Sequence, residues 1–199
     1  GGADQGPLGY PTGDQACYLE DGGCFQDFQE GAVYWSQATG AQPVLGSIQK
    51  KWASTTWETG PLGYPTGAEW CGLSGKGCVQ KFQGGSIYWS SGSGAHAMVP
   101  GAMWDLWRAR GADEGSLGYP TGDQACGLAD GGCSQSFAKG IVYTSKGGDE
   151  RWSAELFKTA HQDETVAKAD FVVPVSKSLT EQVVCDLKVE VVFAQFLEQ

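Results

Sequence analysis

Basic residues, histidines and long apolar runs are scarce in this 199-residue sequence. Its 13 Lys and Arg residues are outnumbered by 23 Asp and Glu residues, so the formal charge is −10 at pH 7. A nucleic-acid-binding surface needs clustered Lys and Arg to neutralise phosphates, and here they are scattered. No apolar stretch approaches the roughly 18 residues that cross a bilayer. We therefore expect neither a nucleic-acid partner nor a membrane span.

Familiar catalytic motifs are also missing. His96 and His161 lie in unlike contexts, and the chain has neither a Gly-x-Ser-x-Gly elbow nor a Gly-rich phosphate loop. Paired carboxylates of a glycosidase are set by distance in space, which the sequence does not give. We expect no enzyme activity, no cofactor and no metal, and we keep a hydrolase of cell-wall polymers as a third hypothesis.

Glycine, tryptophan and cysteine are abundant instead. The 31 glycines and eight tryptophans indicate many turns between short strands. Six of the seven cysteines form equally spaced pairs, and each pair has more intervening residues than the two to four typical of zinc sites. We predict three disulfides, Cys17–Cys24, Cys71–Cys78 and Cys126–Cys133. Disulfides persist in oxidising compartments, so we expect a secreted, extracellular protein.

A tandem repeat organises the chain. The hexapeptide Leu-Gly-Tyr-Pro-Thr-Gly begins at Leu8, Leu62 and Leu117, with offsets of 54 and 55 residues. Repeats near this length usually form stacked or ring-arranged units. We place three repeats at about 3–57, 58–112 and 113–162, within a region 1–162, followed by a β-rich extension at 163–199.

Each repeat predicts a β-hairpin closed by its disulfide, then a strand and a short helix. Aromatic and β-branched residues favour strands at 31–36, 86–89 and 141–143. Large apolar residues three or four apart favour helices at 46–52 and 101–107, and a third at 151–157. The predicted fold class is α+β, with the repeats in a ring-like or solenoid array.

The hexapeptide itself predicts a rigid turn, because proline restricts its own φ and the preceding residue while glycine permits unusual backbone shapes. Two interpretations stay open. The Leu and Tyr can pack as a corner against neighbouring units, or the Tyr and the turn's backbone can line a ligand groove.

The hexapeptides, the Gly-x-Val/Ile-Tyr-Trp strands and the Gly-x-Ile-x-x-x-Trp helices resemble the LGFP repeat over about residues 3–160. That family occurs in tandem on exported proteins, appended to cell-wall amidases and mycoloyltransferases of mycolate-containing actinobacteria, where it is taken to hold them on the wall polysaccharide. The resemblance implies clefts between neighbouring units, association with the cell wall, and binding of a glycan or cell-wall polysaccharide. His96 matches a histidine common in the family, and Gln42 replaces it in the first repeat.

Recurring aromatic and amide side chains are the candidate ligand groups, because sugar rings can stack on flat apolar faces beside uncharged hydrogen-bonding groups. The alternative is that the aromatic residues form the core. The candidates are Gln26, Tyr34, Trp35, Gln80, Tyr88, Trp89, His96, Gln135 and Tyr143, with Trp57, Trp70 and Trp104 nearby in sequence.

The function predicted is that of a secreted, lectin-like carbohydrate-binding protein. The alternative is a secreted defence or interaction protein, an inhibitor or toxin, that uses the repeats as a scaffold.

The last part of the chain predicts a β-hairpin. Apolar and polar residues alternate over 183–194, and a second strand is favoured at 169–175. This hairpin either completes the repeat array or pairs with a second copy to make a homodimer. Cys185 is then either a buried free thiol or part of an intermolecular disulfide.

Overall fold

The computed structural model describes residues 6–128, 131–145 and 150–154. All of these residues belong to one compact unit. The predicted C-terminal hairpin and Cys185 lie outside the described residues. The ring-like or solenoid arrangement stays a prediction.

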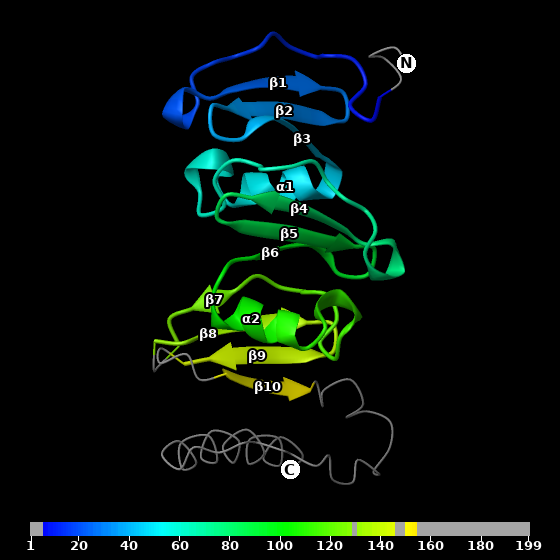
Figure 1. The fold of residues 1–199 in the computed structure, drawn as a ribbon, viewed down its shortest axis with the longest axis vertical. Helices are drawn as coiled ribbons and strands as arrows, with labels where there is room; N and C mark the ends of the chain where they lie inside the picture. The colour runs from blue at the N-terminus through cyan, green and yellow to red at the C-terminus, as the bar shows by residue number, and fades with distance from the viewer. Residues whose placement is uncertain (1–5, 129–130, 146–149, 155–199) are drawn as a thin grey trace, which may run out of the picture. The chain divides into compact units, whose positions relative to one another are not determined.

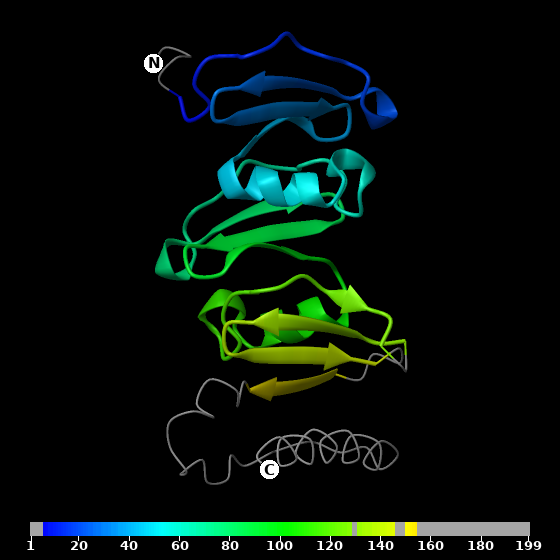
Figure 2. The same ribbon diagram turned by 180° about the vertical axis from the view of Figure 1, so that it is seen from behind.

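Each repeat contains an antiparallel three-stranded meander, and the first two repeats end in a short helix (Figures 1 and 2). The first repeat consists of the 3-10 turn η2 (Glu20–Gly22), β1 (Cys24–Phe28), β2 (Gly31–Ser36), β3 (Gly40–Leu45), α1 (Gly46–Ser54) and η3 (Trp57–Thr59). The second consists of η4 (Ser74–Lys76), β4 (Cys78–Phe82), β5 (Gly85–Ser90), β6 (Gly94–Met98), α2 (Ala102–Ala109) and η5 (Ala112–Glu114). The third consists of β7 (Ala125–Cys126), β8 (Cys133–Phe137), β9 (Gly140–Thr144) and β10 (Glu150–Ala154). The mixed α+β class is confirmed.

The predicted aromatic strand is the middle strand of each three-stranded meander, β2, β5 or β9, and in the third repeat β7 adds a fourth strand beside β8. Side chains alternate between the two faces of a strand. In β2, Ala32 and Tyr34 are buried on one face, while Val33 and Trp35 belong to the other. Both faces of a repeat therefore present apolar groups, and each needs a neighbour to cover it.

Two of the predicted helices are confirmed as α1 and α2. Each buries an apolar pair four residues apart, Ile48 with Trp52 and Met103 with Trp107, because that spacing places both side chains on one helix face.

The helix predicted at 151–157 is wrong over its described part. Arg151 to Ala154 belong to β10, which pairs antiparallel with β9. The third strand of each meander is poor in β-branched residues, as Gly94–Met98 illustrates, so its sequence resembles a loop. The sequence therefore does not predict this third strand, and residues 151–157 were expected to form the helix that follows it in the other repeats.

The three predicted disulfides are confirmed: Cys17–Cys24, Cys71–Cys78 and Cys126–Cys133. Each closes a tight loop that holds the segment after the hexapeptide against the first strand of the sheet. That pairing is a single bridge in the first two repeats, Ala16 to Phe25 and Trp70 to Val79, and a short ladder between β7 and β8 in the third.

In the described part of the chain the hydrophobic core consists of two clusters, and each lies between consecutive repeats. We call these the first junction (repeats one and two) and the second junction (repeats two and three). The first contains Ala32, Tyr34, Val44, Ile48, Trp52, Leu62, Tyr64, Cys78, Phe82 and Ile87. The second contains Met98, Met103, Leu106, Trp107, Leu117, Phe137 and Val142. A helix thus packs on the sheet of the repeat that follows it, and the sequence repeat is not an independent folding unit.

Candidate functional site

The hexapeptide joins neighbouring repeats. Its leucines Leu62 and Leu117 are completely buried, and Tyr64 nearly so. The Tyr64 hydroxyl donates to the Glu20 carbonyl at 2.6 Å, and the Tyr119 hydroxyl donates to the Ser74 carbonyl at the same distance. Each tyrosine therefore bonds to the disulfide loop of the preceding repeat. Burial, reinforced by nearby carboxylates, raises the pKa of Tyr64 and of Tyr119 to about 12.

Glycine in the disulfide loop makes room for this tyrosine. A Cβ atom on Gly23 would lie 2.1 Å from the Tyr64 hydroxyl oxygen, and one on Gly77 would lie 2.1 Å from that of Tyr119. No side chain fits at that distance, so the contact requires glycine at both places. The structural interpretation of the hexapeptide is supported at both junctions.

The recurring glutamines also bridge repeats. Gln80 Nε2 donates to the carbonyls of Pro43 at 2.8 Å and Gly67 at 2.9 Å, so it bonds to β3 of the first repeat and to its own repeat. Gln135 Nε2 bonds in the same way to Ala97 and Gly122, each at 3.0 Å, and both glutamines are buried. Gln26, in the first repeat, donates to Gly13 at 3.1 Å. Their role in ligand binding stays a prediction.

The aromatic candidates have two kinds of surroundings. Tyr34 is buried in the first junction, where burial raises its pKa, and Trp89 packs against the same cluster. Tyr88 packs against the second cluster, and burial raises its pKa to about 12. Among the described aromatic candidates on the middle strands, Trp35 and Tyr143 are the most exposed, each by about two-fifths, and Trp70, named beside them, is more exposed still.

His96 lies in a charged cluster at the second junction. Its Nε2 is 2.8 Å from the Ser93 carbonyl oxygen, and its Nδ1 is 3.6 Å from Asp123 Oδ1. Asp123 also pairs with Lys51 of α1 and accepts a bond from the Ala97 amide at 3.3 Å. Burial opposes ionisation of Asp123, but these bonds and the neighbouring positive charges outweigh it and lower the pKa of its carboxyl.

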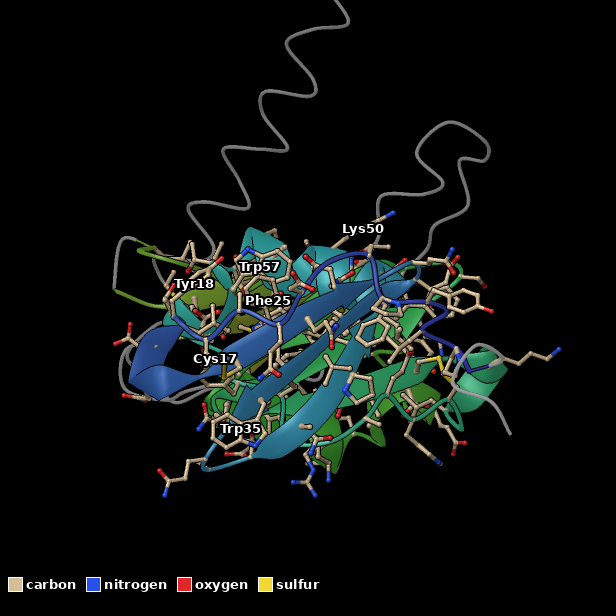
Figure 3. The ribbon with its side chains drawn as sticks, turned by 90° about the horizontal axis from the view of Figure 1, so that it is seen from above. Cys17, Tyr18, Phe25, Trp35, Lys50 and Trp57 are labelled. Atoms are coloured by element: carbon tan, nitrogen blue, oxygen red, sulfur yellow. A yellow bond between two sulfur atoms is a disulfide. The ribbon has the colours of Figure 1, made fainter. Side chains whose placement is uncertain are left out.

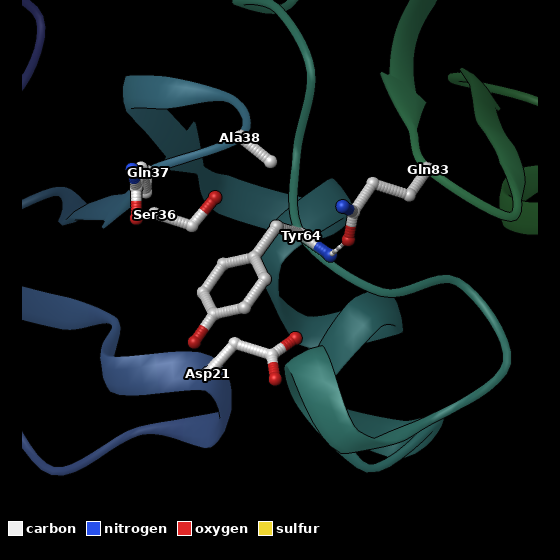
Figure 4. Close-up of a pocket in the computed structure, with 6 residues that line it drawn as sticks. All are labelled: Asp21, Ser36, Gln37, Ala38, Tyr64 and Gln83. Carbon is white, nitrogen blue, oxygen red and sulfur yellow. Dashed lines mark hydrogen bonds between the residues drawn. The ribbon is translucent and has the colours of Figure 1, made fainter.

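A groove with a volume of about 270 Å³ opens at the first junction (Figure 4). The first repeat contributes Asp21 from η2, Ser36 from the end of β2, and Gln37 and Ala38 from the turn that follows, while the second repeat contributes Tyr64 and Gln83. Gln83 Oε1 accepts the Tyr64 backbone N–H at 2.8 Å, which leaves its amide NH₂ for another partner. Among the described residues, Asp21 and Gln37 make no side-chain hydrogen bond. The groove is therefore lined by polar groups that a ligand can bind.

A second hollow, of about 210 Å³, lies on the second repeat. Gly67, Ala68, Val79 and Lys81 line it together with Trp70, whose side chain is 59% exposed. Trp70 has alanine at the same place in the other repeats, Ala16 and Ala125. A large exposed indole beside small residues is a surface on which a flat apolar ligand face can rest.

One cluster among the described residues has metal-ligating groups close together, Glu69 with Cys71 and Cys78. The two sulfurs form a disulfide and are not thiolates. Glu69 alone would then bind the ion, and burial raises the pKa of its carboxyl. This cluster does not fit a metal site.

The LGFP repeat family model matches residues 8–60, 62–115 and 117–156. The chain belongs to the LGFP repeat family. LGFP repeats occur in surface-associated proteins. A comparison with curated proteins found no match.

Two further findings bear on where this LGFP repeat protein acts. Its three disulfides fit an extracellular protein. Over the part of the chain that the structure describes, no helix is both long and apolar enough to cross a membrane.

Most of the groove residues could not be predicted from the sequence, because they do not recur in every LGFP repeat. Asp21, Gln37 and Gln83 are replaced at the second junction by Gly75, Ser91 and Ala138. Of the groove residues, only Tyr64 is a candidate from the sequence, as the hexapeptide tyrosine. The recurring residues pack the repeats together and form hydrogen bonds between them. The groove is indicated instead by surface positions at which the residue type differs from one repeat to the next.

Proposed function

We propose that this protein is an exported, non-catalytic LGFP repeat protein that binds a hydroxyl-rich glycan in the groove of the first junction. The supporting observation is the lining of this groove, to which two repeats contribute a carboxylate, two primary amides and a buried tyrosine. Carboxylates accept and amides both donate and accept hydrogen bonds, so this set can bind the hydroxyl groups of a sugar.

Two of the side chains that line the groove are held in place by hydrogen bonds. Tyr64 is bonded to the Glu20 carbonyl, and Gln83 is oriented by the Tyr64 backbone N–H. Side chains that are already oriented lose less conformational entropy when a ligand binds. The Trp70 hollow offers a separate stacking surface on the same repeat.

A junction-swap variant tests the proposal with substitutions that this fold already contains. Asp21→Gly, Gln37→Ser and Gln83→Ala together give the first groove the side chains found at the second junction. Binding is measured by isothermal titration of glycans identified on an array and by pull-down on insoluble cell-wall polysaccharide. We expect wild-type binding and a loss of at least about tenfold in the swap variant, because several hydrogen bonds are removed together.

Gln29→Ala is the matched control, because Gln29 Oε1 accepts the Tyr10 N–H at 3.0 Å in the first repeat as Gln83 does in the second, but it does not line the groove. This control should bind like wild type. Trp70→Ala separates the two hollows. If the swap variant binds normally while Trp70→Ala does not, the groove is not the site, and if wild type binds no glycan at all, the function is wrong.

A further inference from the structure

The first repeat carries an outward face that matches the faces buried at the two junctions. We call it the N-terminal face, and it consists of Leu8, Tyr10, Gln26, Phe28, Val33 and Trp35. Its counterparts in the second repeat are Leu62, Tyr64, Gln80, Phe82, Ile87 and Trp89, which lie in or against the first junction. The same residue types thus recur on this face of the first repeat.

Burial differs sharply between the two sets. Leu62, Phe82 and Ile87 are buried, whereas Leu8, Phe28 and Val33 are only half-buried. Tyr10 is 56% exposed, and Trp35, visible over β2 in Figure 3, is 40% exposed. A contiguous apolar surface of this kind typically marks an interaction site.

Hydrogen bonding identifies what the N-terminal face lacks. Gln80 and Gln135 each donate one bond within their repeat and a second to the third strand of the preceding repeat. Within residues 6–128, 131–145 and 150–154, Gln26 donates only to Gly13, which corresponds to the first of these bonds. A strand carbonyl that lay against Gln26 as the Pro43 carbonyl lies against Gln80 would accept the second bond.

We propose that the N-terminal face binds the third-repeat end of a second copy of this chain, head to tail. The register of the sheets identifies the acceptor. Pro43 pairs with Val33 and Ala97 pairs with Ile87, and Trp152 of β10 pairs with the equivalent Val142. The backbone carbonyl of Trp152 therefore takes the position of the two carbonyls that bind Gln80 and Gln135.

The strand that carries this carbonyl is placed for such a contact. β3 and β6 are edge strands of their sheets, and β10 is the edge strand of the third sheet in the described structure. An edge strand offers backbone carbonyls to a neighbouring chain. Because the two contacting surfaces differ, a head-to-tail dimer leaves one surface of each kind available, and the association continues beyond the dimer into chains or rings.

Analytical ultracentrifugation of the full chain tests this inference over a wide concentration range. We expect wild type to form dimers and then longer species as concentration rises. Val33→Asp and Trp35→Ser should each weaken association at least about tenfold, as the loss of a central interface residue does. Tyr18→Ser is the control, because Tyr18 is also exposed but has glycine, Gly72 and Gly127, at the same place in the other repeats. Circular dichroism confirms that each variant is folded.

A mixing experiment tests the direction of the contact. Val33→Asp blocks only the N-terminal face, so this variant should still cap wild-type chains and shorten them. Face-to-face dimers would exclude the variant, and that result overturns the head-to-tail inference. A wild-type protein that stays monomeric, or an equal effect of Tyr18→Ser and Trp35→Ser, also overturns it. None of these outcomes depends on glycan binding.

Discussion

At the first junction Trp57 stacks on Tyr34 with ring centroids 5.9 Å apart, whereas Ala112 takes the place of Trp57 at the second. There Trp104 lies 5.9 Å from Tyr88 instead, from a position that is Gln49 in α1. An aromatic ring is thus supplied from η3 in one junction and from the helix in the other. Since packing needs the ring volume rather than a given position, both solutions are compatible with the fold.

The centre of the two junctions is the same. Trp52 Nε1 donates to the Gly63 carbonyl at 3.1 Å, and Trp107 Nε1 donates to Gly118 at 2.8 Å. The hexapeptide tyrosines and the bridging glutamines recur with them. These contacts are hydrogen bonds from side chains to backbone carbonyls, and they recur at both junctions.

The periphery of the two junctions differs in chemistry. Gln42 and Ala68 at the first junction are replaced by His96 and Asp123 at the second, where Asp123 also binds Lys51. The first junction has the polar groove at its periphery. Recurring residues therefore hold the repeats together, and the residues that differ between repeats set the chemistry of each junction.

The largest expected effect is that of removing a central tryptophan. Trp52→Ala and Trp107→Ala should each lower the free energy of unfolding by about 3–5 kcal/mol, because each deletes a fully buried indole. Urea denaturation measures both. Trp52→Phe and Trp107→Phe, which lose less volume, keep the comparison possible if the alanine variants do not fold. A small loss at one junction only would show that the centres are not equivalent.

The bridging glutamines should come next. Gln80→Leu and Gln135→Leu each remove two hydrogen bonds to part-buried carbonyls, which costs about 1–3 kcal/mol. Gln80 Oε1 is itself buried with no partner among the described residues, so its removal offsets part of the cost and Gln80→Leu should be the milder variant. Gln26→Leu loses a single bond and is the control. Thermal denaturation gives the order, and Gln80→Leu as the most destabilising of the three would contradict this account.

The charged cluster should have the smallest effect. Asp123→Asn should cost about 0.5–1 kcal/mol at pH 7, because an ion pair this exposed is screened by water; the Asp123 side chain is 47% exposed. The reciprocal variant Ala68→Asp places a carboxylate beside Gln42, which carries no charge, so it should not increase the free energy of unfolding.

The pH dependence has a definite sign. Because folding lowers the pKa of Asp123 below its ordinary 3.8, its stabilisation is complete above the unfolded pKa and is lost as pH falls through the folded pKa. The difference in urea midpoint between wild type and Asp123→Asn should therefore shrink on acidification from pH 5 to about pH 3. A difference that grows over this interval would exclude the ion pairs as its source.

Much of the local structure follows from local chemistry. The spacing of Cys17 and Cys24 predicted the disulfide, and the β-branched and aromatic run at 31–36 predicted β2. The helices α1 and α2 followed from apolar residues on one helix face. The strand β10 did not, because its propensity is weak and its pairing with β9 is a contact between segments rather than a property of either.

Residue types at fixed spacing are enough to identify the repeat, the three disulfides, the aromatic strands and membership of the LGFP repeat family. The bonds that Tyr64, Trp52 and Gln80 make across repeats are visible only in three dimensions, because their partners belong to segments of a different repeat. The tertiary structure also decided that the polar groove opens at the first junction and that the first repeat exposes a face its successors bury. The physical reason is that each core is shared between two repeats, so the environment of a residue depends on its neighbour in the array as well as on its own repeat.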